Sequence, residues 1–152
     1  MKARNIIIGI ALGIAIGIAP QFYVQKAPVQ EISAVEFVEI DHIVDLANMV
    51  RAEHGCETPL VVNVDLQEAS KERVLWVSDG NWSHDGVWET VKKHYDYKVA
   101  GENLARDFDS DEAMIEAWME SPLHRKNLLN CNFTETGVSR NGDYVVHLFG
   151  KK

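Results

Sequence analysis

Three side chains capable of acid–base or metal chemistry stand inside apolar surroundings, in separate parts of the chain. His84 lies in "NWSHDG", Glu102 in "GENLA" and His124 in "SPLHR". Each string falls at a break between regular elements, where binding and catalytic residues concentrate. Two imidazoles and a carboxylate can hold a divalent metal such as zinc with its fourth position open, and they can equally act as an acid–base pair. All three residues are therefore candidate metal ligands and candidate catalytic residues.

The spacing of these residues does not by itself bring them together. They lie 18 and 22 residues apart, and the chain contains six histidines, so chance alone can supply a pair. A lone histidine is more often solvated or hydrogen-bonded than a ligand. Convergence of the three side chains is therefore a prediction about the fold.

Other residues near these strings are weaker candidates. Ser83 is a candidate nucleophile beside His84, although adjacent side chains rarely face each other. Trp82 and Trp88 flank the same histidine, and we expect them in the core first, with the rim of a cleft as the alternative. His147, in the last predicted strand, can reach the same side of a sheet.

Apolar periodicity and capping signals predict the helices that would position these residues. Asn63 or Asp65 is the expected N-cap of one helix, and Asp109, three residues before a glutamate, begins a capping box. Ser121 is the expected N-cap of another, which places Pro122 in the first helical position that proline favours. The predicted helices cover residues 40–53, 63–78, 87–95, 109–119 and 121–129.

The strands are predicted by extended strings between the helices. "AGENLARDF" is one such string, and "TGVSRNGDYVVHLFG" predicts a hairpin with Asn141-Gly142 as its two-residue turn. Helices that lie between the strands in sequence predict a mixed α/β fold. We expect a small, mainly antiparallel, three-stranded sheet flanked by helices.

The first residues have the composition of a targeting segment. Lys2 and Arg4 precede an apolar run of 14 residues, from Ile6 to Ala19. A membrane-spanning helix needs about 20 residues, which favours a signal peptide, whereas a poor cleavage site and renewed apolar character at residues 22–24 favour an uncleaved membrane anchor. Both alternatives stay open, and both place the rest of the chain outside the cytoplasmic membrane.

Net charge and cysteine content indicate which partners the chain can bind and which cellular compartment suits it. The formal net charge of −8 opposes binding to phosphate backbones, so we expect no nucleic-acid partner. The chain has two cysteines, Cys56 and Cys131, the smallest number that can pair outside the cytoplasm. A disulfide between them is expected, with two buried thiols as the alternative.

Five short strings occur in an order that is specific as a set: "WSH", "AGENLA", "AWMESPLHRKNLL", "FTETGV" and "VVHLFG". With them, residues 40–150 resemble the CAP superfamily of cysteine-rich secretory proteins, antigen five and pathogenesis-related proteins, and are most similar to its bacterial, SCP-like branch. The resemblance implies an α-β-α sandwich with a cleft lined by two histidines and acidic residues. It assigns His84, Glu102 and His124 to that cleft, with Glu120 as the nearest candidate for a second acid.

The N-terminal composition and this resemblance together divide the chain into residues 1–24, a signal peptide or membrane anchor, 25–38, a linker, and 39–152, a CAP/SCP-like domain. It implies an exported binding or interaction module for a wall, lipid or protein ligand, with a cleft able to hold zinc or another divalent metal. The alternative is a metal-dependent or acid–base hydrolase, a peptidase or cell-wall-active enzyme, that uses the same residues. The sequence contains neither HExxH nor Gly-x-Ser-x-Gly, which favours the binding module.

Overall fold

The computed structural model describes residues 34–152. The predicted N-terminal segment 1–24, and the predicted linker 25–38 up to residue 33, lie outside the described residues, so these boundaries stay predictions. Within the described part, no helix combines the length and the apolar character needed to cross a bilayer.

Five helices and four strands make up the described part of the chain. In order along it they are α1 (Ala34–Glu53), β1 (Val61–Val62), α2 (Val64–Ser78), α3 (Val87–His94), β2 (Val99–Arg106), α4 (Asp111–Glu120), α5 (Pro122–Leu128), β3 (Glu135–Asn141) and β4 (Tyr144–Lys151). The helices and strands predicted from the sequence are thereby confirmed in type and order. The first helix begins at Ala34, within the predicted linker 25–38, and the other ends differ by a few residues.

The sheet has one strand more than predicted, and that strand is paired in parallel, so the sheet is mixed, with two of its three pairings antiparallel. Its order is β1-β3-β4-β2, with β3 and β2 antiparallel to β4 and β1 parallel to β3. The prediction of three strands was wrong because β1 is only Val61–Val62, too short to show the alternation by which a strand is found in a sequence.

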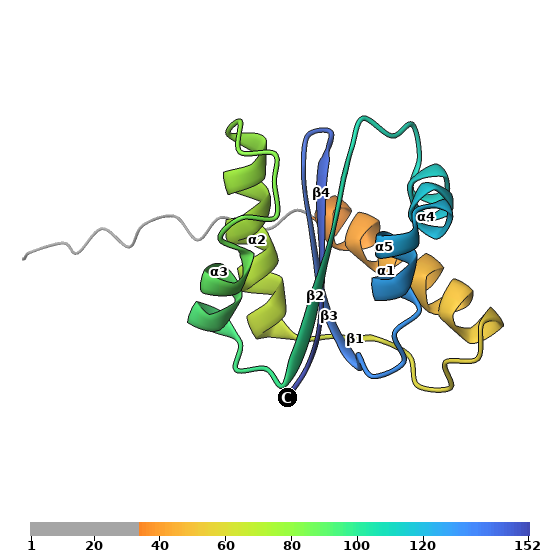
Figure 1. The fold of residues 1–152 in the computed structure, drawn as a ribbon. Helices are drawn as coiled ribbons and strands as arrows, with labels where there is room; N and C mark the ends of the chain where they lie inside the picture. Colours follow the sequence, from red (N-terminus) through yellow and green to blue (C-terminus); the bar gives the residue numbers. More distant parts are fainter. Residues whose placement is uncertain (1–33) are drawn as a thin grey trace, which may run out of the picture. The chain divides into compact units, whose positions relative to one another are not determined.

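Helices cover both faces of this sheet, in three layers. α2 and α3 lie on one face, and α1, α4 and α5 lie on the other (Figure 1). Each face has its own apolar core: one is centred on Leu66, Val77 and Val91, and the other on Trp118, Leu128 and Phe149. The α-β-α arrangement implied by the family resemblance is therefore present.

Two helix starts explain how local chemistry sets the element ends. Asn63 caps α2 as predicted, because its side-chain oxygen accepts hydrogen bonds from the N–H groups of Asp65 and Leu66. The cap of α4 is Ser110 rather than Asp109, and its hydroxyl accepts from the N–H of Ala113. The predicted capping box was wrong by one residue, since both residues are favourable caps.

The β3–β4 hairpin also closes one residue later than predicted. Asn141 pairs with Tyr144, so the two loop residues are Gly142 and Asp143. Gly142 has a φ of 57°, and Asp143 is not among the described residues with positive φ. This favours a turn that places glycine first rather than one that needs two positive φ angles.

A disulfide and a buried arginine fix the corner where α5 turns into β3. Cys56 and Cys131 are joined across 75 residues, which confirms the predicted pairing. Arg51, fully buried at the end of α1, donates to the carbonyls of Leu128, Asn130 and Phe133 at 2.9, 3.1 and 2.9 Å. The end of α5 is thus held at a fixed place beside the sheet.

Candidate functional site

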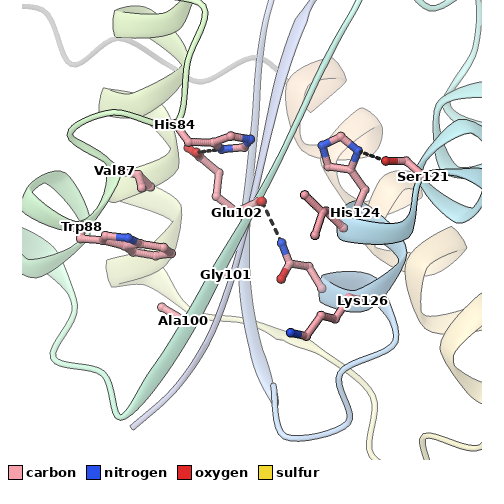
Figure 2. Close-up of a pocket in the computed structure, with 11 residues that line it drawn as sticks. His84, Val87, Trp88, Ala100, Gly101, Glu102, Ser121, His124 and Lys126 are labelled. Atoms are coloured by element: carbon pink, nitrogen blue, oxygen red, sulfur yellow. Dashed lines mark hydrogen bonds and ion pairs between the residues drawn. The ribbon is translucent and has the colours of Figure 1, made fainter.

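A cleft of about 480 Å³ lies between α3 and α5, above strand β2. Its floor includes Ala100, Gly101 and Glu102, and one wall carries Val87 and Trp88 from α3. The remaining lining residues are His84, Ser121, Leu123, His124, Lys126 and Asn127. The three residues singled out in the sequence therefore do line one cavity (Figure 2).

His84 comes from the loop between α2 and α3 and is oriented by a carboxylate. Its Nδ1 donates to Oε2 of Glu102 at 2.6 Å. The His84 side chain is 57% exposed, whereas that of Glu102 is 2% exposed. Because Nδ1 carries the donated proton, Nε2 keeps its lone pair, and this nitrogen is on the cleft side in Figure 2.

His124 stands in the first turn of α5 on the opposite wall. Its Nδ1 shares a 3.0 Å hydrogen bond with the hydroxyl of Ser121. Ser121 is the N-cap residue of α5, as predicted, but its side chain serves the imidazole instead of a backbone N–H. Burial, and to a smaller extent the nearby His84, lowers the pKa of His124, which favours the neutral ring.

The two imidazoles face each other across the cleft with their remaining nitrogens turned inward (Figure 2). The distance between the centroids of the His84 and His124 rings is 6.5 Å. Two histidines on one tetrahedral zinc have centroids about 5 Å apart, given Zn–N bonds of about 2 Å. The observed centroids are therefore roughly 1 Å farther apart than those of two zinc-bound imidazoles.

Glu102 differs from the other two because both its oxygens already have partners. Oε1 accepts from Nε of Arg73 at 2.7 Å, and Oε2 accepts from His84. Among residues 34–152 no group of three or more His, Cys, Asp or Glu side chains is arranged to hold a metal ion. Glu102 as a third ligand stays a prediction, and its observed contacts are those of a carboxylate that orients an imidazole.

Arg73 is the functional neighbour that sequence reasoning missed. It falls on the inward face of α2, where a charged residue conflicted with the apolar pattern. Its side chain is 1% exposed and forms an ion pair with Glu102. A buried arginine in a helix stripe indicates a buried acid elsewhere, and that signal could have identified the pair.

Two asparagines attach α5 to the strand that carries Glu102. Asn127 donates to the backbone carbonyl of Glu102 at 3.0 Å and to the side-chain oxygen of Asn103 at 3.0 Å. Asn103, fully buried, donates to the carbonyl of His124 at 3.1 Å. These contacts fix His124 relative to Glu102 through short, mutually satisfied bonds.

Four weaker candidates lie outside the cleft. Ser83 hydrogen bonds with Asp85, and Trp82 packs edge-on against Tyr144. Glu120 is exposed at the end of α4 and does not line the cavity. His147 is fully buried, where it stacks on Phe149 with centroids 4.0 Å apart. Of the two tryptophans considered for the rim, only Trp88 is there.

A family model described as the cysteine-rich secretory protein family, CAP, matches residues 44–146. This range contains all three cleft residues and most of the described fold. The chain belongs to the cysteine-rich secretory protein family. The family resemblance of the short strings is thereby confirmed.

Two relatives of this chain come from Bacillus subtilis (strain 168). The chain is 33% identical over 103 residues to the uncharacterized protein YkwD, a match that covers 63% of this chain and 40% of YkwD. It is 28% identical over 121 residues to the uncharacterized membrane protein YlbC, covering 72% of this chain and 34% of YlbC. The chain thus spans well under half the length of these relatives.

Three solved bacterial structures share the fold of this chain. An extracellular protein containing an SCP domain from Bacillus anthracis superposes with a TM-score of 0.72 at 27% identity, over 78% of this chain and 42% of that one. A cysteine-rich secretory protein from Staphylococcus aureus gives 0.70 at 25%, over 84% and 41%. An outer surface protein from Borrelia burgdorferi gives 0.66 at 22%, over 74% and 91%, and shares the fold.

Proposed function

We propose that this CAP domain is an extracytoplasmic binding module that captures a wall, lipid or protein ligand in the His84–His124 cleft. The observation that carries the proposal is that the imidazoles of the cleft have free nitrogens whereas its carboxylate has none of its oxygens free. Two imidazole nitrogens face open space, whereas the carboxylate beside His84 already accepts hydrogen bonds from Arg73 and His84. The cleft therefore offers groups that bind and orient a ligand.

The contacts of Glu102 and Ser83 weigh against these two residues as the base and the nucleophile of the hydrolase alternative, which leaves the two imidazoles as its candidate acid–base groups. A general base must come within hydrogen-bond reach of the proton it removes. The Glu102 side chain is 2% exposed, and taking up such a proton would weaken its buried ion pair with Arg73. Ser83 donates its hydroxyl to Asp85 at 3.1 Å and does not line the cleft. The proposal of binding rather than hydrolysis therefore rests on Glu102 and Ser83 being engaged with other partners.

The walls of the cleft indicate a ligand with an apolar side and a polar side. Trp88 and Leu123 are 40% and 76% exposed, respectively, and both line the cavity. Lys126 adds a donor on the α5 wall, whereas the two N–H groups of the Asn127 amide already donate to Glu102 and Asn103. A volume of about 480 Å³ lies within the range of small-molecule sites, so the cleft can accept a single ring, a short acyl segment or one side chain with its backbone.

A divalent metal such as zinc would be held in this cleft by Nε2 of His84 and Nε2 of His124. When bound, it would supply a Lewis acid that attracts a carboxylate, phosphate or carbonyl of the ligand. Glu102 would keep the proton on Nδ1 of His84, which leaves Nε2 free to bind. Ser121 would hold the ring of His124 in the same way.

The extracytoplasmic location is supported by the start of the sequence and by similar proteins. Basic Lys2 and Arg4 precede the apolar run, and the similar structures include an extracellular protein and an outer surface protein. Protease treatment of intact cells should degrade the tagged domain. Protection equal to that of a cytoplasmic marker would contradict this location.

Calorimetric titration with zinc tests the cleft directly. Wild-type domain should bind zinc, and the His84→Ala/His124→Ala variant should lose that heat. His42→Ala/His54→Ala is the matched control because it removes two exposed histidines away from the cavity. Equal zinc affinity in the cleft variant and the wild type would overturn the metal-binding role.

Turnover assays separate the binding module from the hydrolase. Purified domain, with and without zinc, should leave peptidoglycan and an unstructured protein intact. Hydrolysis that His124→Ala abolishes, in a variant with unchanged circular dichroism, would replace the binding proposal with the enzymatic one.

A further inference from the structure

The buried guanidinium of Arg73 contacts both the carboxylate that holds the ring of His84 and the backbone on either side of His84. The ring of His84 is held by Glu102, and Nε of Arg73 donates to the other oxygen of that carboxylate at 2.7 Å. The backbone around His84 is held by the same side chain. Nη2 of Arg73 donates to the carbonyl of Ser83 at 2.5 Å, and Nη1 donates to that of Asp85 at 2.8 Å. These two carbonyls belong to the residues on either side of His84.

We infer that Arg73 is a positioning residue that sets the ring orientation and the tautomer of His84. A free histidine on an exposed loop can rotate its ring and place its proton on either nitrogen. Here the loop is attached through its carbonyls, and the carboxylate that receives the Nδ1 proton is attached to the same guanidinium. Both degrees of freedom of the ring therefore depend on one side chain of α2.

The planar, forked shape of arginine is what this arrangement requires. Three donors on one rigid plane reach one carboxylate and two carbonyls at once, and the plane also covers the ring of Trp76 at 4.4 Å. A lysine ammonium is a single point on a flexible stem and cannot span these acceptors. A positive charge alone therefore cannot hold the ring and the loop of His84. Arg73→Lys keeps the charge and removes the forked set of donors.

The fold provides a matched control in Arg51. It is also fully buried, and it also donates to several backbone carbonyls, those of Leu128, Asn130 and Phe133. Arg51 does not line the cleft and contacts neither His84 nor Glu102 in these bonds. Arg51→Lys therefore removes a comparable set of bonds without touching the attachments of His84.

The decisive measurement is the tautomer of His84, read from ring nitrogen chemical shifts by nuclear magnetic resonance at a pH where the ring is neutral. In the wild type the proton should be on Nδ1. Arg73→Lys should give a mixture of the two tautomers, whereas Arg51→Lys should keep the wild-type state. A folded Arg73→Lys with an unchanged His84 tautomer overturns the inference, and so does a wild-type ring protonated on Nε2.

A second variant covers the case in which Arg73→Lys does not fold. Glu102→Gln replaces one of the two acceptor oxygens with an amide nitrogen, so Arg73 and His84 no longer each have a side-chain oxygen to donate to. The inference expects loss of the Nδ1 tautomer in this variant as well. Retention of that tautomer in folded Glu102→Gln would show that the carboxylate does not transmit the position of Arg73, which overturns the inference.

The importance of this positioning rests on the proposed binding role of the cleft, and the two can fail separately. If the wild type binds zinc, Arg73→Lys should weaken binding about 10- to 100-fold, the usual effect of losing an orienting partner of a ligand, while Arg51→Lys stays within about twofold. If the wild type does not bind zinc, the metal role fails, and the tautomer alone still decides the role of Arg73.

Discussion

Two buried arginines, Arg73 and Arg51, show how one residue type serves two purposes in this fold. Arg73 belongs to α2 and holds a carboxylate together with the loop that carries His84. Arg51 belongs to α1 and, in its hydrogen bonds to Thr58, Leu128, Asn130 and Phe133, donates to backbone carbonyls. The contacts of Arg51 close a corner of the chain, and those of Arg73 lead to a side chain that faces the cleft. Burial of a charge therefore says little about function until its partners are known.

Stability should depend most on the Arg51 corner, because a covalent bond joins the same segments there. Cys56→Ser/Cys131→Ser should lower the free energy of unfolding by about 4–5 kcal/mol, the value for freeing a loop of this length in the chain-entropy model. Urea unfolding by circular dichroism measures the loss. The His84 tautomer should not change in folded protein, since Arg73 and its partners lie away from this corner.

The outcome of the cysteine variant also tests the comparison. If the variant keeps its stability, Arg51 alone closes the corner and the disulfide adds nothing to it. If the variant is folded but its His84 tautomer shifts, the corner and the cleft are coupled, and the separation of the two arginines is wrong.

Sequence patterns predicted the elements of both regions but only one of their long-range contacts. Capping signals at Asn63 and Ser121 are local, so the helices that begin there could be found. The disulfide could be predicted because two cysteines allow one pairing. Arg73 and Glu102 are 29 residues apart, and no local pattern links them. Their pairing is set by the packing of α2 against the sheet.

The convergence of the cleft residues was predicted by family resemblance and not by periodicity. Periodicity placed His84, Glu102 and His124 on a loop, a strand and a helix start, but it could not state that those elements meet. Glu102 was expected as a metal ligand because its residue type suits one. What its type could not show is that a buried guanidinium already occupies one of its oxygens.

The loss of folding stability at low pH should also arise on the Arg51 side of the sheet, from His147. Nε2 of this ring donates to the hydroxyl oxygen of Thr136 at 2.8 Å, since that hydroxyl donates to the carbonyl of Leu148. Nδ1 is buried without a hydrogen-bond partner. Burial, and to a smaller extent the charge of Arg51, lowers the pKa of His147 to about 3 from an ordinary value of 6.5.

The sign of the pH effect follows from where the proton binds. Below about pH 6.5 the unfolded chain protonates His147 and the folded chain does not, so stability is full above that pH and declines as the pH falls toward 3. At pH 5 the loss is about 2 kcal/mol, given about 1.4 kcal/mol per pH unit. Urea unfolding at pH 7 and pH 5 measures it.

His147→Phe should reduce this dependence between pH 7 and pH 5, because it removes the most strongly shifted imidazole, and the remaining loss should include that of His124, whose pKa burial also lowers. His54→Gln is the control, since His54 is exposed and should leave the pH dependence as in the wild type. An equal loss of stability at pH 5 in His147→Phe and the wild type would assign the acid sensitivity to other groups.

The smallest expected effect on stability is at Asn127, which lies between the two regions. Its amide donates to the carbonyl of Glu102 and to Asn103, so it ties α5, held at its end by Arg51, to the strand whose carboxylate Arg73 holds. Asn127→Ala should cost about 1–2 kcal/mol, the typical value for two partly buried hydrogen bonds. Urea unfolding measures this loss in the free energy of unfolding. The more informative readout is His124, whose ring should become more mobile while the tautomer of His84 stays fixed. If both rings change together, the cleft is one connected network, and the two arginines act on a single unit and not on separate regions.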